Sequence, residues 1–377
     1  MSKQRLLGII LIVVTLGGAI AALVLNYRWN QPLGPSLELP TNTPSSSSNN
    51  PVPGLTTDSI IAEPGSTQVL PGTQSAAGTQ VANSGPYPTA TSHPLCGGPA
   101  TITILLIGSD QRGTGYLYGL ADSIHIVRVD FTQPNLMVID FPRDLWVEIP
   151  DIAAHHGITH GKLNQAYLYG NPGMGYYDGP GEGPGLLART LNLNFGLRVD
   201  HYLALDTTTF VSMIDAVGGV DIRVTSPIDL SYGIDDPGPE YFLSIGTHHL
   251  DGKQALLLAT NRIPSTFQRM EYQKLILTSL REKLLTRSMI PQLPKLVSQF
   301  IDFVQTDLSP RDINNLLCIA QAIPAENIRA DSFPQEMFKA SNTYDPDRKV
   351  YTFIYEVDFD QIRAMVADFM RGIWPFH

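Results

Sequence analysis

Three strand-like segments, each flanked by charged residues, constrain this chain more than any other feature. Apolar and β-branched residues fill Ile102–Ile107, Ser123–Val129 and Leu136–Phe141, and turn residues bound each segment. Consecutive strands are usually neighbours in one sheet, so the charged residues at their ends should meet at a sheet edge. These flanking residues are Asp110, Arg112, Asp122, Arg143 and Asp144.

The residue types in this group suit a phosphate ligand and a divalent cation. Carboxylate oxygens are the hard ligands that Mg²⁺ prefers, which makes Asp110 and Asp122 the candidate metal ligands. The planar guanidinium of an arginine binds phosphoryl oxygens bidentately. The alternative is that both aspartates only cap turns and that Arg143 pairs with Asp144 at the surface. Their ordered recurrence beside the ends of successive strands favours a site.

The N-terminus predicts a single transmembrane anchor. Leu6–Leu25 carries no charged residue and, at 1.5 Å per residue, is long enough to cross a hydrocarbon layer of about 30 Å. Lys3 and Arg5 precede it, so residues 1–5 should be cytoplasmic and the rest of the chain extracytoplasmic, at the cell membrane. A cleaved signal peptide with its site near Ala19–Ala21 is the alternative, but the apolar run continues beyond that point.

The composition then divides the remaining chain in two. Residues 26–97 are rich in Pro, Ser, Thr, Asn and Gly and lack an apolar period, which predicts a disordered stalk. Residues 98–377 alternate strand and helix patterns, which predicts one α/β domain with a sizeable core. The chain has a formal net charge of −10, which argues against nucleic acid as a partner.

The chain has two cysteines, Cys96 and Cys318. Outside the membrane an even pair favours a disulfide that ties the start of the domain to a late helix. Two buried free thiols are the alternative, and neither spacing suggests a metal-thiolate site.

Several strings, taken in order, resemble the LytR-CpsA-Psr (LCP) cell-wall ligases. They are GSDQR, LADS, FPRD, KLNQAY, VDHYLALDTTTFVSMIDAVGGVDIRV and LDGKQAL. The resemblance implies an α-β-α sandwich with a central mixed β-sheet and a hydrophobic groove for a polyprenyl chain. It also implies an enzyme that transfers a glycan-1-phosphate from a polyprenyl-pyrophosphate donor to a hydroxyl of a cell-wall polymer, with Mg²⁺.

The same resemblance assigns roles to residues. Asp110, Asp122 and Arg143 would be catalytic, the two aspartates would hold Mg²⁺, and one of them could accept the proton of the attacking hydroxyl. The implied pyrophosphate-binding residues are Arg112, Lys162, Asn164, Arg262, Arg269 and Gln273.

Taken without the resemblance, Lys162 is an ordinary lysine at the start of a helix. Arg269 and Gln273, spaced i and i+4, could simply solvate the outer side of a helix.

The chain departs from the family pattern at Leu120, Thr260 and Tyr272, where arginines are usual, and at Thr266, where an aspartate is usual. Each missing arginine removes a charge-assisted hydrogen bond worth about 1.5–3 kcal/mol. Two alternatives therefore stay open beside the ligase. One is a regulatory paralogue that binds polyprenyl pyrophosphate without consuming it, and the other is a metal-dependent pyrophosphatase in which water replaces the sugar hydroxyl.

Overall fold

The computed structural model describes residues 27–39, 93–111, 115–232, 234–263 and 265–373. The predicted anchor at residues 6–25, most of the predicted stalk and Arg112 lie outside these described residues. Within the described ranges, every helix is too short or too polar to cross a membrane.

A six-stranded mixed sheet lies at the centre of the fold, in the order β11-β6-β1-β2-β3-β12. The pairs β1/β6 and β3/β12 are parallel, and β1/β2, β2/β3 and β6/β11 are antiparallel. The three segments expected as strands are therefore neighbours, and the predicted central mixed sheet is confirmed. The strands are β1 (Thr101–Ser109), β2 (Ala121–Asp130), β3 (Asn135–Asp140), β6 (His201–Leu205), β11 (Gln305–Thr306) and β12 (Ile328–Ser332).

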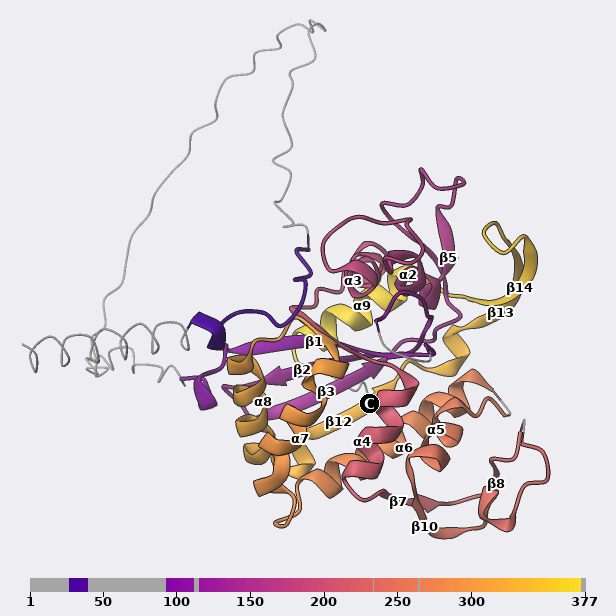
Figure 1. Cartoon of the computed structure of the whole chain (residues 1–377). Helices are drawn as coiled ribbons and strands as arrows, with labels where there is room; N and C mark the ends of the chain where they lie inside the picture. The colour runs from indigo at the N-terminus through magenta and orange to yellow at the C-terminus, as the bar shows by residue number, and fades with distance from the viewer. Residues whose placement is uncertain (1–26, 40–92, 112–114, 233, 264, 374–377) are drawn as a thin grey trace, which may run out of the picture. The chain divides into compact units, whose positions relative to one another are not determined.

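Helices cover both faces of the sheet, as the predicted sandwich requires (Figure 1). On one face α2 (Leu163–Gly170), α3 (Glu182–Phe195) and α9 (Phe359–Met370) share a core cluster with alternate strand residues such as Leu105 and Ile107. The intervening strand residues pack with α8 (Pro310–Ala322) on the other face, where α7 (Leu293–Phe300) also lies. Alternation along each strand thus divides the core into two layers.

A second group of helices lies beyond the strand ends and has its own apolar cluster. Its helices are α4 (Thr207–Ala216), α5 (Gly252–Thr260) and α6 (Thr266–Leu284), and its strands are β7 (Val220–Val224), β8 (Ile228–Asp229), β9 (Phe242–Leu243) and β10 (Gly246–Leu250). Asp206 caps α4, because its Oδ1 accepts a hydrogen bond of 2.6 Å from the Thr209 N–H. Two hairpins complete the described domain: β4 (Trp146–Glu148) with β5 (His160–Lys162), and β13 (Lys339–Asp345) with β14 (Val350–Glu356).

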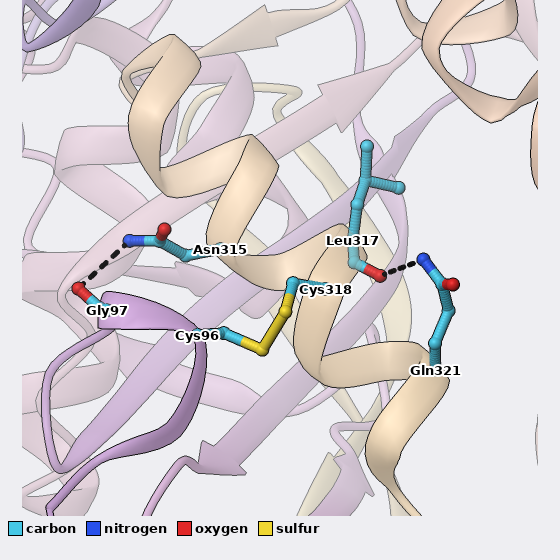
Figure 2. Close-up of a disulfide and its surroundings, with 6 residues drawn as sticks. All are labelled: Cys96, Gly97, Asn315, Leu317, Cys318 and Gln321. Carbon is cyan, nitrogen blue, oxygen red and sulfur yellow. Dashed lines mark hydrogen bonds between the residues drawn. A yellow bond between two sulfur atoms is a disulfide. The ribbon is translucent and has the colours of Figure 1, made fainter.

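Cys96 and Cys318 form a disulfide, which confirms the predicted pairing (Figure 2). It joins the short turn before β1 to α8, and the Asn315 side-chain amide on α8 donates a 3.3 Å hydrogen bond to the Gly97 carbonyl beside it. The bridge spans 222 residues of sequence. In the chain-entropy account, closing so long a loop stabilises the folded state by about 5 kcal/mol.

Candidate active site

The carboxylate of Asp122, near the start of β2, is the centre of a cationic cluster. Its Oδ1 accepts hydrogen bonds from Arg143 Nη1 and, at 3.3 Å, from Asn164 Nδ2. Its Oδ2 lies 3.3 Å from Arg262 Nη2 and 4.0 Å from Arg269 Nη1. One largely buried carboxylate therefore faces three guanidinium groups.

The topology explains why these residues meet. β2 and β3 are antiparallel, with His125 opposite Asp140, so the start of β2 lies beside the turn that follows β3 and carries Arg143. The first turn of α2 brings Asn164 to the same place, and the Asn164 N–H donates to the Arg143 carbonyl at 3.1 Å. Arg262 comes from the turn between α5 and α6. The fold thus brings Asp122, Arg143 and Asp144 of the predicted group together at one end of the sheet, whereas Arg112 lies outside the described residues.

Asp144 forms a second ionic centre next to the first. It is 4% exposed and accepts hydrogen bonds from Arg143 Nε at 3.3 Å, Lys162 Nζ at 3.0 Å and Thr266 Oγ1 at 3.4 Å. Burial opposes its ionisation, but the charges of Arg143 and Lys162 outweigh burial and hold the pKa of Asp144 below its usual range. Asp144 was noted in the sequence but not assigned to the site, because only the fold shows that it holds Lys162 and the start of α6.

Asp110 follows β1, and its Oδ1 accepts a 2.7 Å hydrogen bond from the Leu120 N–H. Burial is the largest influence and raises the pKa of Asp110; the Leu120 hydrogen bond opposes this, and the nearby Asp122 charge adds to it. Leu120, which stands where the family usually has an arginine, thus contributes a backbone donor to the site rather than a charge.

Arg269 points into the protein, so the alternative that it only solvates the outer side of α6 is excluded. It is 2% exposed, and burial followed by the Arg143 charge lowers its pKa to about 10, against the opposing effect of Asp122. Its Nε–H has no hydrogen-bond partner among the described residues. A buried guanidinium with an unsatisfied donor can receive an anion, because leaving the donor unpaired is costly.

Gln273 lies one helical turn beyond Arg269 and also faces inward. Its Nε2 donates to the Ala259 carbonyl at 3.0 Å, which turns its Oε1 toward Ser123, whose hydroxyl donates to it at 3.1 Å. Both α6 residues therefore line the interior space between the sheet and α6.

This space is a cavity of about 330 Å³ with one polar end. Asp110, Asp122 and Arg269 lie at the polar end, and apolar side chains from β1, β6 and α4–α6 form most of the remaining wall. The volume is within the usual range of small-molecule sites, about 300–1,000 Å³. The shape suits an amphiphile with a charged head and an apolar tail. The apolar lining is Leu106, Leu203, Leu205, Phe210, Met213, Leu256, Ile276, Leu277 and Leu280.

The two aspartates form a limited metal-binding set. Among the residues that the structure describes, no group of three or more His, Cys, Asp or Glu side chains is arranged to hold a metal ion. Mg²⁺, however, commonly takes one or two carboxylates and completes its shell with substrate phosphates and water. Burial is the main cause of the raised pKa of Asp110, and the Asp122 charge adds to it. Two neighbouring carboxylates are a donor set that fits Mg²⁺ bound together with a phosphate ligand.

Sequence reasoning missed three interacting residues beside this cavity. Ser123 Oγ lies 2.5 Å from His125 Nε2, and His125 Nδ1 is hydrogen bonded to Asp140 on the neighbouring strand. The sequence did contain a signal for these residues, because polar or titratable side chains interrupt the apolar runs of both β2 and β3. Ser123 and His125 are two residues apart and therefore lie on the same face of β2.

Two curated proteins are similar in sequence. The regulatory protein MsrR of Staphylococcus aureus is 28% identical over 211 residues, which cover 55% of this chain and 56% of MsrR. The polyisoprenyl-teichoic acid--peptidoglycan teichoic acid transferase TagV of Bacillus subtilis is 27% identical over 212 residues, which cover 55% of this chain and 49% of TagV. The chain thus spans about half the length of these relatives.

The fold is also similar to a solved structure with a ligand. TagT of Bacillus subtilis, with bound octaprenyl pyrophosphate lipid, superimposes with a TM-score of 0.51 at 17% identity, covering 75% of this chain and 96% of TagT. This likeness establishes the α/β fold. The LytR_cpsA_psr family model matches residues 72–366, which is most of the chain. The motifs around Asp110, Asp122 and Arg143 and the fold that joins them therefore have one explanation, namely that the chain belongs to the LytR-CpsA-Psr family.

Proposed function

We propose that this chain is a phosphotransferase that moves a glycan-1-phosphate from a polyprenyl-pyrophosphate donor to a hydroxyl of a cell-wall polymer. The observation that carries the proposal is the cavity, in which an apolar wall leads to Asp122 and the buried Arg269, and Arg143 is bound to the same Asp122 carboxylate. The name of TagV, a teichoic acid transferase, and the lipid pyrophosphate bound to TagT support this choice of substrate class.

The polar end can bind a pyrophosphate through its cations. Arg143, Arg262, Arg269 and Lys162 outnumber the three carboxylates around them. Asp122 holds the guanidiniums in place, and the unpaired Arg269 Nε–H gives an incoming phosphate oxygen a buried donor. Guanidiniums bind phosphate oxygens in planar pairs of hydrogen bonds, so a pyrophosphate can accept donors that the single carboxylate cannot satisfy.

The same arrangement suits the chemical step. As the bridging P–O bond of the donor lengthens, negative charge collects on the leaving polyprenyl phosphate, and fixed guanidiniums stabilise that charge without reorganising. Asp110 and Asp122 would hold Mg²⁺, which would neutralise phosphate oxygens during transfer. Asn164 and Lys162 keep Asp122 and Asp144, and through them Arg143, in position.

The departures from the family pattern leave this cluster intact. Thr260 donates its hydroxyl to the Leu256 carbonyl at 2.8 Å, and Tyr272 packs with the apolar cluster of α4–α6, so neither adds charge to the polar end. Arg143, Arg262 and Arg269 remain around Asp122, so the chain keeps three guanidiniums for a pyrophosphate despite these departures.

A transfer assay tests this proposal. The full-length protein in detergent is incubated with a polyprenyl-pyrophosphate glycan and Mg²⁺, with and without peptidoglycan fragments. We expect release of polyprenyl phosphate that depends on the acceptor and is lost in Arg143→Gln, whereas Arg363→Gln on the exposed side of α9 should keep full activity. Tight donor binding without release would favour the regulatory alternative. Free glycan phosphate without polymer attachment would favour the pyrophosphatase. Omitting Mg²⁺ from the assay tests whether transfer depends on this metal.

We further propose that residues 6–25 anchor the chain in the cell membrane, with the domain outside. An uncharged run of this length with basic residues before it supports the arrangement. Protease added to intact cells should degrade the domain, and it should leave the domain whole if the orientation is reversed.

A further inference from the structure

Ser123, His125 and Asp140 form a continuous hydrogen-bonded series on one face of the sheet. Ser123 Oγ is 2.5 Å from His125 Nε2, and His125 Nδ1 is hydrogen bonded to Asp140 Oδ1. The other oxygen of Asp140 accepts a 3.3 Å hydrogen bond from Ser332 Oγ on β12. His125 and Asp140 are 5% and 3% exposed, so this geometry is held within the fold.

The order of these contacts is that of a nucleophile, its base and the group that orients the base. When His125 donates from Nδ1 to Asp140, its Nε2 is free to take the proton of Ser123. Gln273 Oε1 accepts the Ser123 hydroxyl hydrogen at 3.1 Å on the other side. Because a hydroxyl has a single hydrogen, that hydrogen must turn from Gln273 to His125 Nε2 before His125 can act as the base. A purely structural network would also satisfy these groups, but it would not need to place its serine in the wall of a ligand cavity.

Ser123 is open to the cavity because its neighbour on β1 is Gly108. Both residues line the cavity, together with Asp122 and Arg269. A Cβ atom at Gly108 would lie 2.9 Å from the Ser123 Cβ, so any side chain there would crowd the serine. The Ser123 hydroxyl, the Asp122 carboxylate, the Arg269 guanidinium and the apolar wall therefore share one space.

We propose that Ser123 is a covalent nucleophile that accepts the phosphoryl group of a lipid pyrophosphate, with His125 as its base and Asp140 as the residue that positions His125. The identity of the natural electrophile, a polyprenyl-pyrophosphate glycan, rests on the proposed transferase function. It makes the transfer a double displacement through a phosphoserine.

The two steps balance. In the first, Ser123 Oγ bonds to the glycan-bearing phosphorus, the bridging P–O bond breaks, and polyprenyl phosphate leaves with the electron pair. The Ser123 proton passes to His125 Nε2 and on to the leaving phosphate. In the second, the acceptor hydroxyl attacks the phosphoserine and gives its proton to His125, which returns a proton to Ser123 as the Ser123 O–P bond breaks.

A phosphonylating probe tests the nucleophile without any transfer reaction. The full-length protein in detergent is treated with a long-chain alkyl fluorophosphonate, and the added mass is followed with time and located by peptide mapping. We expect one label per chain on Ser123, no label in Ser123→Ala, and labelling at least about a hundredfold slower in His125→Gln. Ser298→Ala, a change at an exposed residue of α7, is the matched control, and thermal unfolding shows whether each variant is folded.

The outcomes separate this inference from the proposed function. Absence of labelling, labelling that persists in folded Ser123→Ala, or full transfer activity in Ser123→Ala would overturn the nucleophile and leave the transferase standing. Labelling at Ser123 in a protein that transfers nothing would support the nucleophile and count against the transferase.

Discussion

The two ends of the cavity are built in different ways. The polar end collects side chains from distant parts of the chain, with Asp122 on β2, Arg143 after β3, Asn164 on α2 and Arg269 on α6. The apolar end comes mainly from β1, β6 and the adjoining helices α4–α6. At the polar end each charged group depends on the others, whereas at the apolar end each side chain contributes its own contact area.

This difference predicts different responses to mutation. Removing one member of a buried ionic cluster leaves its partners uncompensated, so effects should be large and specific for charged ligands. Removing apolar area should cost less and should affect charged and uncharged lipids equally. Measuring the binding of both polyprenyl pyrophosphate and the uncharged polyprenol therefore distinguishes a mutation that affects the polar end from one that affects the apolar end.

The largest effect is expected for Asp122→Asn. The loss of the charge that holds Arg143, Arg262 and Arg269 should reduce the rate of transfer about a thousandfold, or about 4 kcal/mol, while polyprenol binding stays unchanged. Asp221→Asn, at an exposed carboxylate paired with His249, is the matched control. Equal losses of polyprenol and pyrophosphate binding would show that the two ends are not separable.

Asp144→Asn should have the next largest effect, on stability. At pH 7 the change should cost about 3 kcal/mol because Arg143 and Lys162 lose a buried partner. The folded-state pKa of Asp144 is lowered, so its contribution is present above the usual carboxyl range and is lost as pH falls through the folded value. Urea unfolding of both proteins should therefore show a difference that shrinks with acidification. Asp360→Asn, an exposed ion pair on α9, should show almost none at any pH.

Arg269→Met should remove an anion donor while keeping the apolar length of the side chain. Affinity for polyprenyl pyrophosphate should fall by about 2 kcal/mol, roughly thirtyfold, and affinity for polyprenol should stay the same or rise. Calorimetric titration with both lipids measures this. Unchanged pyrophosphate binding would mean that the unpaired Nε–H does not meet the head group.

The smallest effect is expected at the apolar end. Phe210→Ala should weaken the binding of both lipids by about 1.5 kcal/mol, roughly tenfold, because both tails lose the same contact area. Phe242→Ala, at an exposed ring on β9, should leave both affinities unchanged. A loss confined to the pyrophosphate would place the lipid tail outside this cavity.

Much of the site could be predicted, because the local pattern of apolar residues located the strands and the adjacency of consecutive strands brought their flanking charged residues together. The three strand segments ended at the expected charges, and Cys96 paired with Cys318. The roles of the individual site residues and of Mg²⁺ stay predictions, as does the membrane anchor. The inward direction of Arg269 was not predictable, since helical spacing alone allows either face of α6.

The sequence by itself determined the elements and their order, because propensity, capping and alternation act within a few residues. It also carried the motifs that place the chain in its family. Only the tertiary structure decided which side chains meet. The register of β2 against β3 sets His125 opposite Asp140, and the packing of α6 over the sheet brings Arg269 to Asp122 and Gln273 to Ser123. These contacts depend on residues far apart in the chain, and no local pattern encodes them.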